Sequence, residues 1–156
     1  MEALDRRSIR AQCIVCRGDK LLMVQHHLDG GSWWCLPGGG VEEGETPAEA
    51  AVRELHEECC VEGVIVRETG HWVYRTEADL VTFLVDIGGQ TPRIGTDPEF
   101  SGAEQVLVDV RWMALTELCE RDRAFLWAAG LLGVPPFCDE VSRWGDDVSY
   151  PGRRRE

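Results

Sequence analysis

The densest group of chemically reactive side chains is a run of carboxylates between residues 38 and 60. Seven glutamates and one arginine give this stretch a local charge of −6, namely Glu42, Glu43, Glu45, Glu49, Arg53, Glu54, Glu57 and Glu58. Carboxylates packed this closely repel one another unless a cation lies among them. Hard divalent cations such as Mg²⁺ and Mn²⁺ prefer clustered oxygen ligands. The run therefore indicates a metal site, with a solvated acidic surface as the alternative.

Three of these glutamates fall on one side of a predicted helix. Thr46 is a favourable N-cap, Pro47 suits the first helical position, and Glu49 completes a capping box. On a helical wheel the carboxylates at positions 54, 57 and 58 share an arc of about 100°. An apolar stripe that can pack on a sheet lies beside them, formed by Ala51, Val52, Leu55 and Cys59.

A proline and three glycines, Pro37-Gly38-Gly39-Gly40, come just before this helix. Backbone of this kind turns sharply or approaches a ligand closely. Exposed backbone N–H groups are also favourable partners of phosphate. A glycine-rich segment followed by an acidic helix thus favours a site for a cation together with a phosphate.

The spacing of these residues resembles the Nudix box of the Nudix hydrolase family, Gly-x5-Glu-x7-Arg-Glu-U-x-Glu-Glu-x-Gly-U, with U aliphatic. Gly39 is followed after five residues by Glu45, and seven residues later by the segment 53–61. Every fixed position matches except Cys60, which stands where the pattern has glycine. That residue is expected to be left-handed, where a Cβ costs roughly 1–2 kcal/mol. The resemblance spans roughly residues 8–132.

The resemblance implies an α/β fold, a Nudix-like α/β/α sandwich with a mixed β-sheet. It also implies a Mg²⁺-dependent enzyme that cleaves the pyrophosphate bond of a nucleoside diphosphate linked to another moiety, with Mn²⁺ as an alternative cation. By position, the metal ligands would be Glu54, Glu57, Glu58 and the backbone of Gly39. Arg53 and Glu45 would orient this cluster through hydrogen bonds. The expected partner is a small nucleotide, with no nucleic acid or membrane, and a homodimer stays open.

The box does not settle the general base. Family members often take it from a loop before a late strand, here residues 96–104. Glu104 is the first candidate, Glu99 the second, and a box glutamate such as Glu57 the third. Asp109 is expected to pair with Arg111 rather than to act in catalysis.

Aromatic residues that could stack on a nucleotide base are Trp33, Tyr74 and Phe100. Trp33 is expected in a loop over residues 28–33. The identity of the second moiety stays open. So do three rival functions: a non-catalytic nucleotide-sensing Nudix-like domain, an isoprenoid diphosphate isomerase and an acidic interaction module. Because all three box glutamates are present, hydrolysis is the favoured interpretation.

The elements that must position these residues are interleaved strands and helices. Apolar alternation starts at Ile9, and Gly18-Asp19 predicts a hairpin. Further strands are predicted at 61–66, 73–74, 80–87 and 106–112, and a second helix at 122–132. A single domain over 1–156 is expected, with its core at about 8–132 and a C-terminal tail from 134 to 156. This order is typical of a mixed α/β domain.

Composition excludes several function classes. The 156 residues are 44% hydrophobic, which suits one globular domain. A net charge of −12 argues against a nucleic-acid or anionic-membrane surface. No apolar stretch approaches the ~20 residues of a membrane span, and a cytoplasmic location is expected. The seven cysteines are expected to be reduced, and Cys13 and Cys16 should face opposite sides of a strand rather than form a metal pair.

Overall fold

The computed structural model describes residues 8–73, 78–96, 106–135 and 137–142. Its strands are β1 (Ser8–Ile14), β2 (Cys16–Arg17), β3 (Lys20–Leu28), β4 (Gly31–Cys35), β5 (Gly38–Gly40), β6 (Val64–Val73), β7 (Ala78–Asp86) and β8 (Leu107–Ala114). Its helices are α1 (Pro47–Cys59), α2 (Glu120–Ala128) and α3 (Phe137–Ser142), with 3₁₀ turns η2 (Leu115–Glu117) and η3 (Leu131–Gly133).

The strands form two four-stranded sheets within these ranges, where the sequence suggested one. The first has the order β5-β1-β7-β6 and is mixed, because β1 and β7 are parallel while the other pairs are antiparallel. The second contains β2, β3, β4 and β8 and is antiparallel, with β3 pairing to the other three strands. The mixed α/β class expected from the sequence is confirmed.

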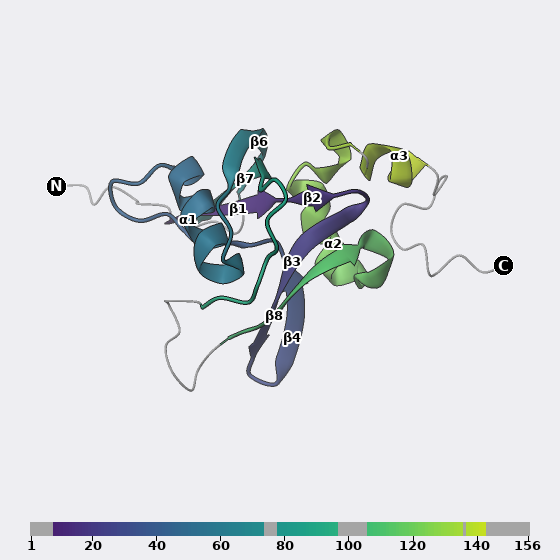
Figure 1. Cartoon of the computed structure of the whole chain (residues 1–156), viewed down its shortest axis with the longest axis horizontal. Helices are drawn as coiled ribbons and strands as arrows, with labels where there is room; N and C mark the ends of the chain where they lie inside the picture. The colour runs from purple at the N-terminus through teal and green to yellow at the C-terminus, as the bar shows by residue number, and fades with distance from the viewer. Residues whose placement is uncertain (1–7, 74–77, 97–105, 136, 143–156) are drawn as a thin grey trace.

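Helices cover both sides of the strands, with α1 on one side and α2 and α3 on the other (Figure 1). Strand alternation explains this, because successive side chains of a strand point to opposite faces. In β3, Leu22 and Val24 join the core cluster that contains the buried residues of α1. Leu21 and Met23 join a second cluster with residues of α2. Because the strands bury apolar side chains on both faces, helices must cover both faces, and the molecule has three layers.

Helix α1 begins where the sequence predicts. Glu49 donates its backbone N–H to Thr46 Oγ1 at 3.2 Å, and Thr46 donates its own N–H to Glu49 Oε2 at 2.8 Å. The predicted capping box is therefore formed. At the other end, Cys60 has φ 57° and ψ 36°, so the predicted left-handed residue is also confirmed.

The loop predicted over residues 28–33 is wrong. β3 continues to Leu28, β4 begins at Gly31, and two residues connect them. Asp29 and Gly30 both have positive φ, 51° and 76°, as a type I′ turn requires. Trp33 therefore lies in a strand of a tight hairpin rather than in a loop.

Three other boundaries differ from the prediction. β6 runs from Val64 to Val73, so it begins three residues later than the strand predicted at 61–66 and continues without a break through residues 67–72. Helix α2 begins at Glu120 and ends at Ala128, because Gly130 with φ 86° breaks the chain direction before η3. The core continues past residue 132, since Val134 and Phe137 are buried in the second cluster. No helix in the described part of the chain is long and apolar enough to cross a membrane.

Candidate active site

Arg53 lies at the centre of the acidic cluster. Its Nε donates to both carboxylate oxygens of Glu45 at 3.0 and 3.1 Å. Its Nη1 donates to Glu54 Oε1 at 3.0 Å and to Glu57 Oε2 at 3.2 Å, and its Nη2 donates to the carbonyl of Gly40 at 2.9 Å. Partial burial opposes the charged form, but the hydrogen bonds to Glu45 and Glu54 raise the pKa of Arg53. The guanidinium thus binds α1 to the strand and loop before it.

Glu58 is held from the strand side and is 1% exposed. The backbone N–H of Gly38 donates to its Oε1 at 2.8 Å. His26 Nε2, on β3, lies 3.3 Å from its Oε2. Both oxygens of this carboxylate therefore have partners from β5 and β3.

The surroundings of Glu54 disfavour its charged form. Burial raises its pKa to about 7, the hydrogen bond from Arg53 opposes this rise, and the charges of Glu58 and Glu57 add to it. The carboxylate lies against Gly39, where an added Cβ would collide with Glu54 Oε1. The close backbone approach predicted for the glycine segment is therefore made to this side chain and to β1.

The donor set fits a hard divalent cation in its chemistry. Glu54 and Glu58 are buried carboxylates, and a cation would offset the repulsion between their like charges. The backbone of Gly39 lies beside Glu54. In the described residues no three His, Cys, Asp or Glu side chains converge closely enough to hold a metal ion. Arg53 lies among these carboxylates, and its guanidinium bonds to both Glu54 and Glu57. A cation that binds the Glu54 and Glu57 carboxylates would have to displace Arg53 from them.

A segment far along the chain closes the end of α1. The backbone N–H groups of Arg93, Gly95 and Thr96 donate to the carbonyls of Cys59, Glu58 and Glu57 at 2.9, 2.8 and 2.9 Å. These carbonyls belong to the last helical turn, which has no partners within the helix itself. A Cβ at residue 95 would collide with the Glu57 carbonyl. The segment 93–96 therefore fixes the helix end that bears two of the box glutamates.

A cavity of about 640 Å³ borders the glycine strand. Its lining includes Arg10, Trp33, Trp34, Gly39, Arg121 and Phe125, and His26 also faces it. Asp122, buried at the start of α2, accepts the Trp34 backbone N–H at 3.1 Å and Arg121 Nε at 2.9 Å. The bond to Trp34 fixes that residue against α2; Trp33 and Trp34 together form the tryptophan wall of the cavity.

The structure brings together most, but not all, of the residues predicted for the site. The charged box residues and Gly39 form one cluster, and Trp33 lines the adjoining cavity. Tyr74, Glu99, Phe100 and Glu104 lie outside the described residues. The predicted pairing of Asp109 with Arg111 is confirmed at 2.8 Å.

The cysteines behave as the sequence predicts. All seven are free. Cys13 packs in the cluster beneath α1 and Cys16 against the opposite cluster, so the two side chains face opposite sides. Burial, with a smaller contribution from the charge of Glu58, raises the pKa of the Cys13 thiol, and burial raises that of Cys16 to about 11.

Sequence reasoning missed His26, Arg10 and Gly95. The signal for His26 was available, because it continues the alternating series of Leu22 and Val24 toward α1. Gly95 had no local signal, since its contact with Glu57 depends on chain segments that are distant in sequence. Arg10 directly precedes the buried Ala11 on β1, so its side chain points to the opposite face of the strand, where it lines the cavity.

Comparisons with known proteins find a matching family model and similar structures. The family profile described as NUDIX domain matches residues 6–132. The RNA pyrophosphohydrolase of Rhizobium meliloti (strain 1021) is 37% identical over 82 residues, covering 51% of this chain and 47% of that protein. Nudix hydrolase 25 of Arabidopsis thaliana is 40% identical over 62 residues, covering 39% of this chain and 35% of that protein. The matches thus span less than half the length of these curated relatives.

Solved structures share the fold. A NUDIX hydrolase from Nitrosomonas europaea superposes with a TM-score of 0.60 at 20% identity, covering 92% of both chains. An ADP-ribose pyrophosphatase from Streptococcus suis gives 0.56 at 19% identity, covering 70% of this chain and 75% of that one. At such low identity these similarities concern the architecture of the chain.

Proposed function

Because the chain belongs to the Nudix hydrolase family, we propose that it hydrolyses the pyrophosphate bond of a nucleoside diphosphate linked to another moiety. The observation that supports this most is the placement of the box beside the cavity. Gly39 touches Glu54 on one side and lines the 640 Å³ cavity on the other. A diphosphate in the cavity would therefore lie next to the carboxylates.

We propose Mg²⁺ as the cofactor, with Mn²⁺ as a substitute. Glu54, Glu57, Glu58 and the Gly39 carbonyl would hold the ion. When bound, such a cation neutralises phosphate oxygens and lowers the pKa of a bound water. Arg53 keeps Glu54 and Glu57 at the same edge of α1 and is itself held by Glu45, through the hydrogen bonds described above.

The proton of the attacking water needs an acceptor. Glu57 is the most exposed of the three box glutamates, with 24% of its side chain accessible, and is one candidate. Glu104 and Glu99 remain the candidates from the late loop. General base catalysis of this kind typically contributes about 10²–10⁴-fold.

We propose that the nucleotide base stacks on Trp33 and that Arg10 faces an anionic group of the substrate. Trp33 supplies an aromatic wall. Arg10 lines the same cavity and makes no ion pair with the described residues. A net charge of −12 disfavours long contact with a phosphate backbone. The names of the curated relatives nevertheless make a 5′-triphosphate RNA end the natural comparison substrate.

Product analysis with a nucleotide panel tests the proposal. The full chain is incubated with nucleoside triphosphates, ADP-ribose, UDP-sugars, dinucleoside polyphosphates and 5′-triphosphate RNA, with Mg²⁺ or with EDTA, and the products are separated by ion exchange. Mg²⁺-dependent cleavage of at least one nucleotide is expected. Binding of a nucleotide without cleavage would instead indicate the non-catalytic sensing domain.

A further inference from the structure

We propose that His26 is a positioning residue of the Nudix box, which fixes the Glu58 carboxylate and connects it to the tryptophan wall of the cavity. The inference rests on the function proposed above. It gives a role to a histidine outside the box that contacts both the acidic cluster and the cavity.

The pleat of β3 places this side chain. Leu22 and Val24 point from β3 into the cluster beneath α1, and His26 is the next residue on that face. Its Nε2 lies 3.3 Å from Glu58 Oε2, and its side chain is 16% exposed. An ionised carboxylate only accepts hydrogen bonds, so Nε2 is the nitrogen that donates here.

The second oxygen of Glu58 is held independently. Gly38 donates its backbone N–H to Oε1 at 2.8 Å. With one oxygen fixed by β5 and the other by β3, the carboxylate cannot turn about its terminal bond without breaking a contact. A carboxylate oxygen has two lone pairs, so accepting one hydrogen bond does not by itself prevent contact with a cation.

The other side of the imidazole contacts Trp33. His26 and Trp33 are paired across the β3–β4 ladder. Their ring centroids are 5.7 Å apart at an interplanar angle of 65°, an edge-on contact. Opposite β8, the register skips Val108 between Gln25 and His26, so the extra residue lies in β8 and the alternation of β3 continues through His26. One ring therefore connects the cavity wall to a box carboxylate.

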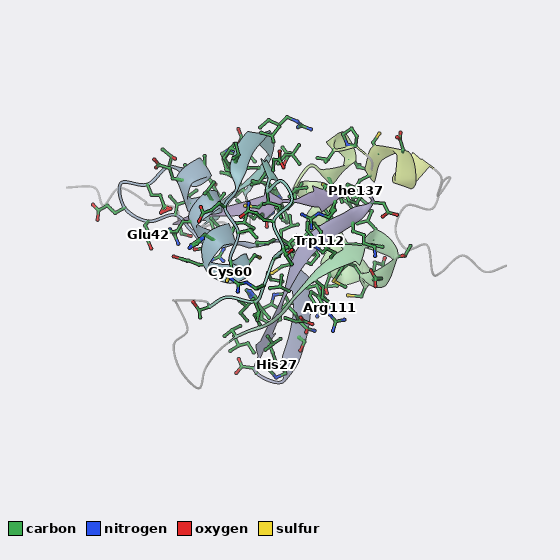
Figure 2. The ribbon with its side chains drawn as sticks, viewed as in Figure 1. His27, Glu42, Cys60, Arg111, Trp112 and Phe137 are labelled. Carbon is green, nitrogen blue, oxygen red and sulfur yellow. The ribbon has the colours of Figure 1, made fainter. Side chains whose placement is uncertain are left out.

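The neighbouring histidine is a matched control. His27 is exposed and lies on the opposite face of β3, with Nδ1 2.7 Å from Ser32 Oγ. Figure 2 shows it toward the end of the β3–β4 hairpin, away from Cys60 at the end of α1. A change at His27 removes a histidine from the same strand without removing a partner of Glu58.

The test measures Mn²⁺ affinity of the full chain without substrate, by electron paramagnetic resonance, together with kcat and KM. Loss of a hydrogen-bond partner of a metal ligand typically weakens metal affinity by about 10–100-fold. His26→Ala should show this loss, and His27→Ala should bind Mn²⁺ within twofold of wild type. His26→Gln should recover most of the affinity, because its amide nitrogen can donate from nearly the same place as Nε2.

Two results would overturn the proposal. If His26→Ala keeps wild-type Mn²⁺ affinity and changes only KM, the ring contacts substrate and does not position Glu58. If His26→Gln folds but binds Mn²⁺ as weakly as the alanine variant, the donated hydrogen bond is not the cause. In both cases the wild-type chain still hydrolyses its nucleotide, whereas failure of the proposed function would show as a wild-type chain that cleaves nothing.

Discussion

Arg53 offsets part of the repulsion among the carboxylates of the box. Its planar fork reaches Glu45 with one nitrogen and Glu54 and Glu57 with another. A lysine would offer one compact charge and could not span these partners with fixed geometry. Arg53 therefore keeps Glu54 and Glu57, on its own helix, beside Glu45 of the preceding loop, and a cation can partly replace it.

The raised pKa of Glu54 makes the stability of the metal-free chain depend on pH. Its pKa is about 7 in the folded chain, above its ordinary value of 4.5, chiefly because it is buried. Both states are protonated below pH 4.5, so the carboxyl contributes no penalty there; the penalty grows between pH 4.5 and 7 and is fully present above pH 7. Glu54→Gln should therefore be more stable than wild type at pH 8 by about 3 kcal/mol.

Urea denaturation in EDTA at pH 5 and pH 8 checks this. The difference between the two proteins should fall to about 1 kcal/mol at pH 5. Glu43→Gln, which changes an exposed carboxylate of the same acidic stretch, should show no such pH-dependent gain. Equal gains for both variants would assign the effect to general charge repulsion rather than to burial.

Cys60 has a backbone conformation that favours glycine. Its φ of 57° costs a side chain roughly 1–2 kcal/mol, while glycine loses more freedom on folding. Cys60→Gly should therefore stabilise the chain by up to about 1 kcal/mol, measured by the urea midpoint. Cys60→Ala keeps the Cβ but removes the thiol, and should gain nothing. A destabilised glycine variant would mean that the thiol packs favourably.

At the scale of elements, the two ends of α1 were unequally predictable. Its start depends on local residues, since Thr46 and Glu49 bond to one another. Its end depends partly on Cys60, a local signal, and partly on Gly95, which is far away in sequence. Sequence patterns report local geometry well, whereas such a distant contact becomes visible only in the folded chain.

Gly95→Ala tests the contact between the segment 93–96 and α1. The added Cβ collides with the Glu57 carbonyl, so the segment must move and its backbone hydrogen bonds weaken. Each such bond contributes about 0.5–1.5 kcal/mol, and a loss of about 2 kcal/mol or more is expected by urea denaturation. Gly89→Ala is the control, because no atom lies within 4 Å of its added Cβ. Equal stability of the two variants would contradict the contact.

Other elements were predicted in kind but not in extent. Asp29-Gly30 is a strong type I′ turn signal. A loop over residues 28–33 ignores this signal and wrongly places Trp33 outside β4. The helix predicted at 122–132 runs past Gly130 because apolar residues continue beyond it. In the structure those residues form the turn η3 instead. In both places glycine with positive φ decided the boundary, and its effect outweighed the apolar pattern.

At the scale of the whole molecule, 28 acidic residues stand against 16 basic ones. A divalent cation that binds only the folded cluster should stabilise the chain, by about 2.7 kcal/mol at about 100 times its Kd. For a chain of this size the Tm should rise by about 5–10 °C. Scanning with Mn²⁺ and with NaCl of equal ionic strength separates binding from screening. The same Tm in both salts would argue against a formed cation site.

The central claim is that the three box glutamates hold the cation for hydrolysis beside the cavity. Turnover of Glu57→Gln at saturating Mg²⁺ and nucleotide, compared with Glu43→Gln, tests it most directly. Glu57 bonds to Arg53 within the cluster, whereas Glu43 is exposed outside it. We expect a loss of at least a thousandfold for Glu57→Gln, roughly 4 kcal/mol of barrier, and activity within twofold of wild type for Glu43→Gln. A folded Glu57→Gln variant that keeps a tenth of wild-type turnover would contradict it.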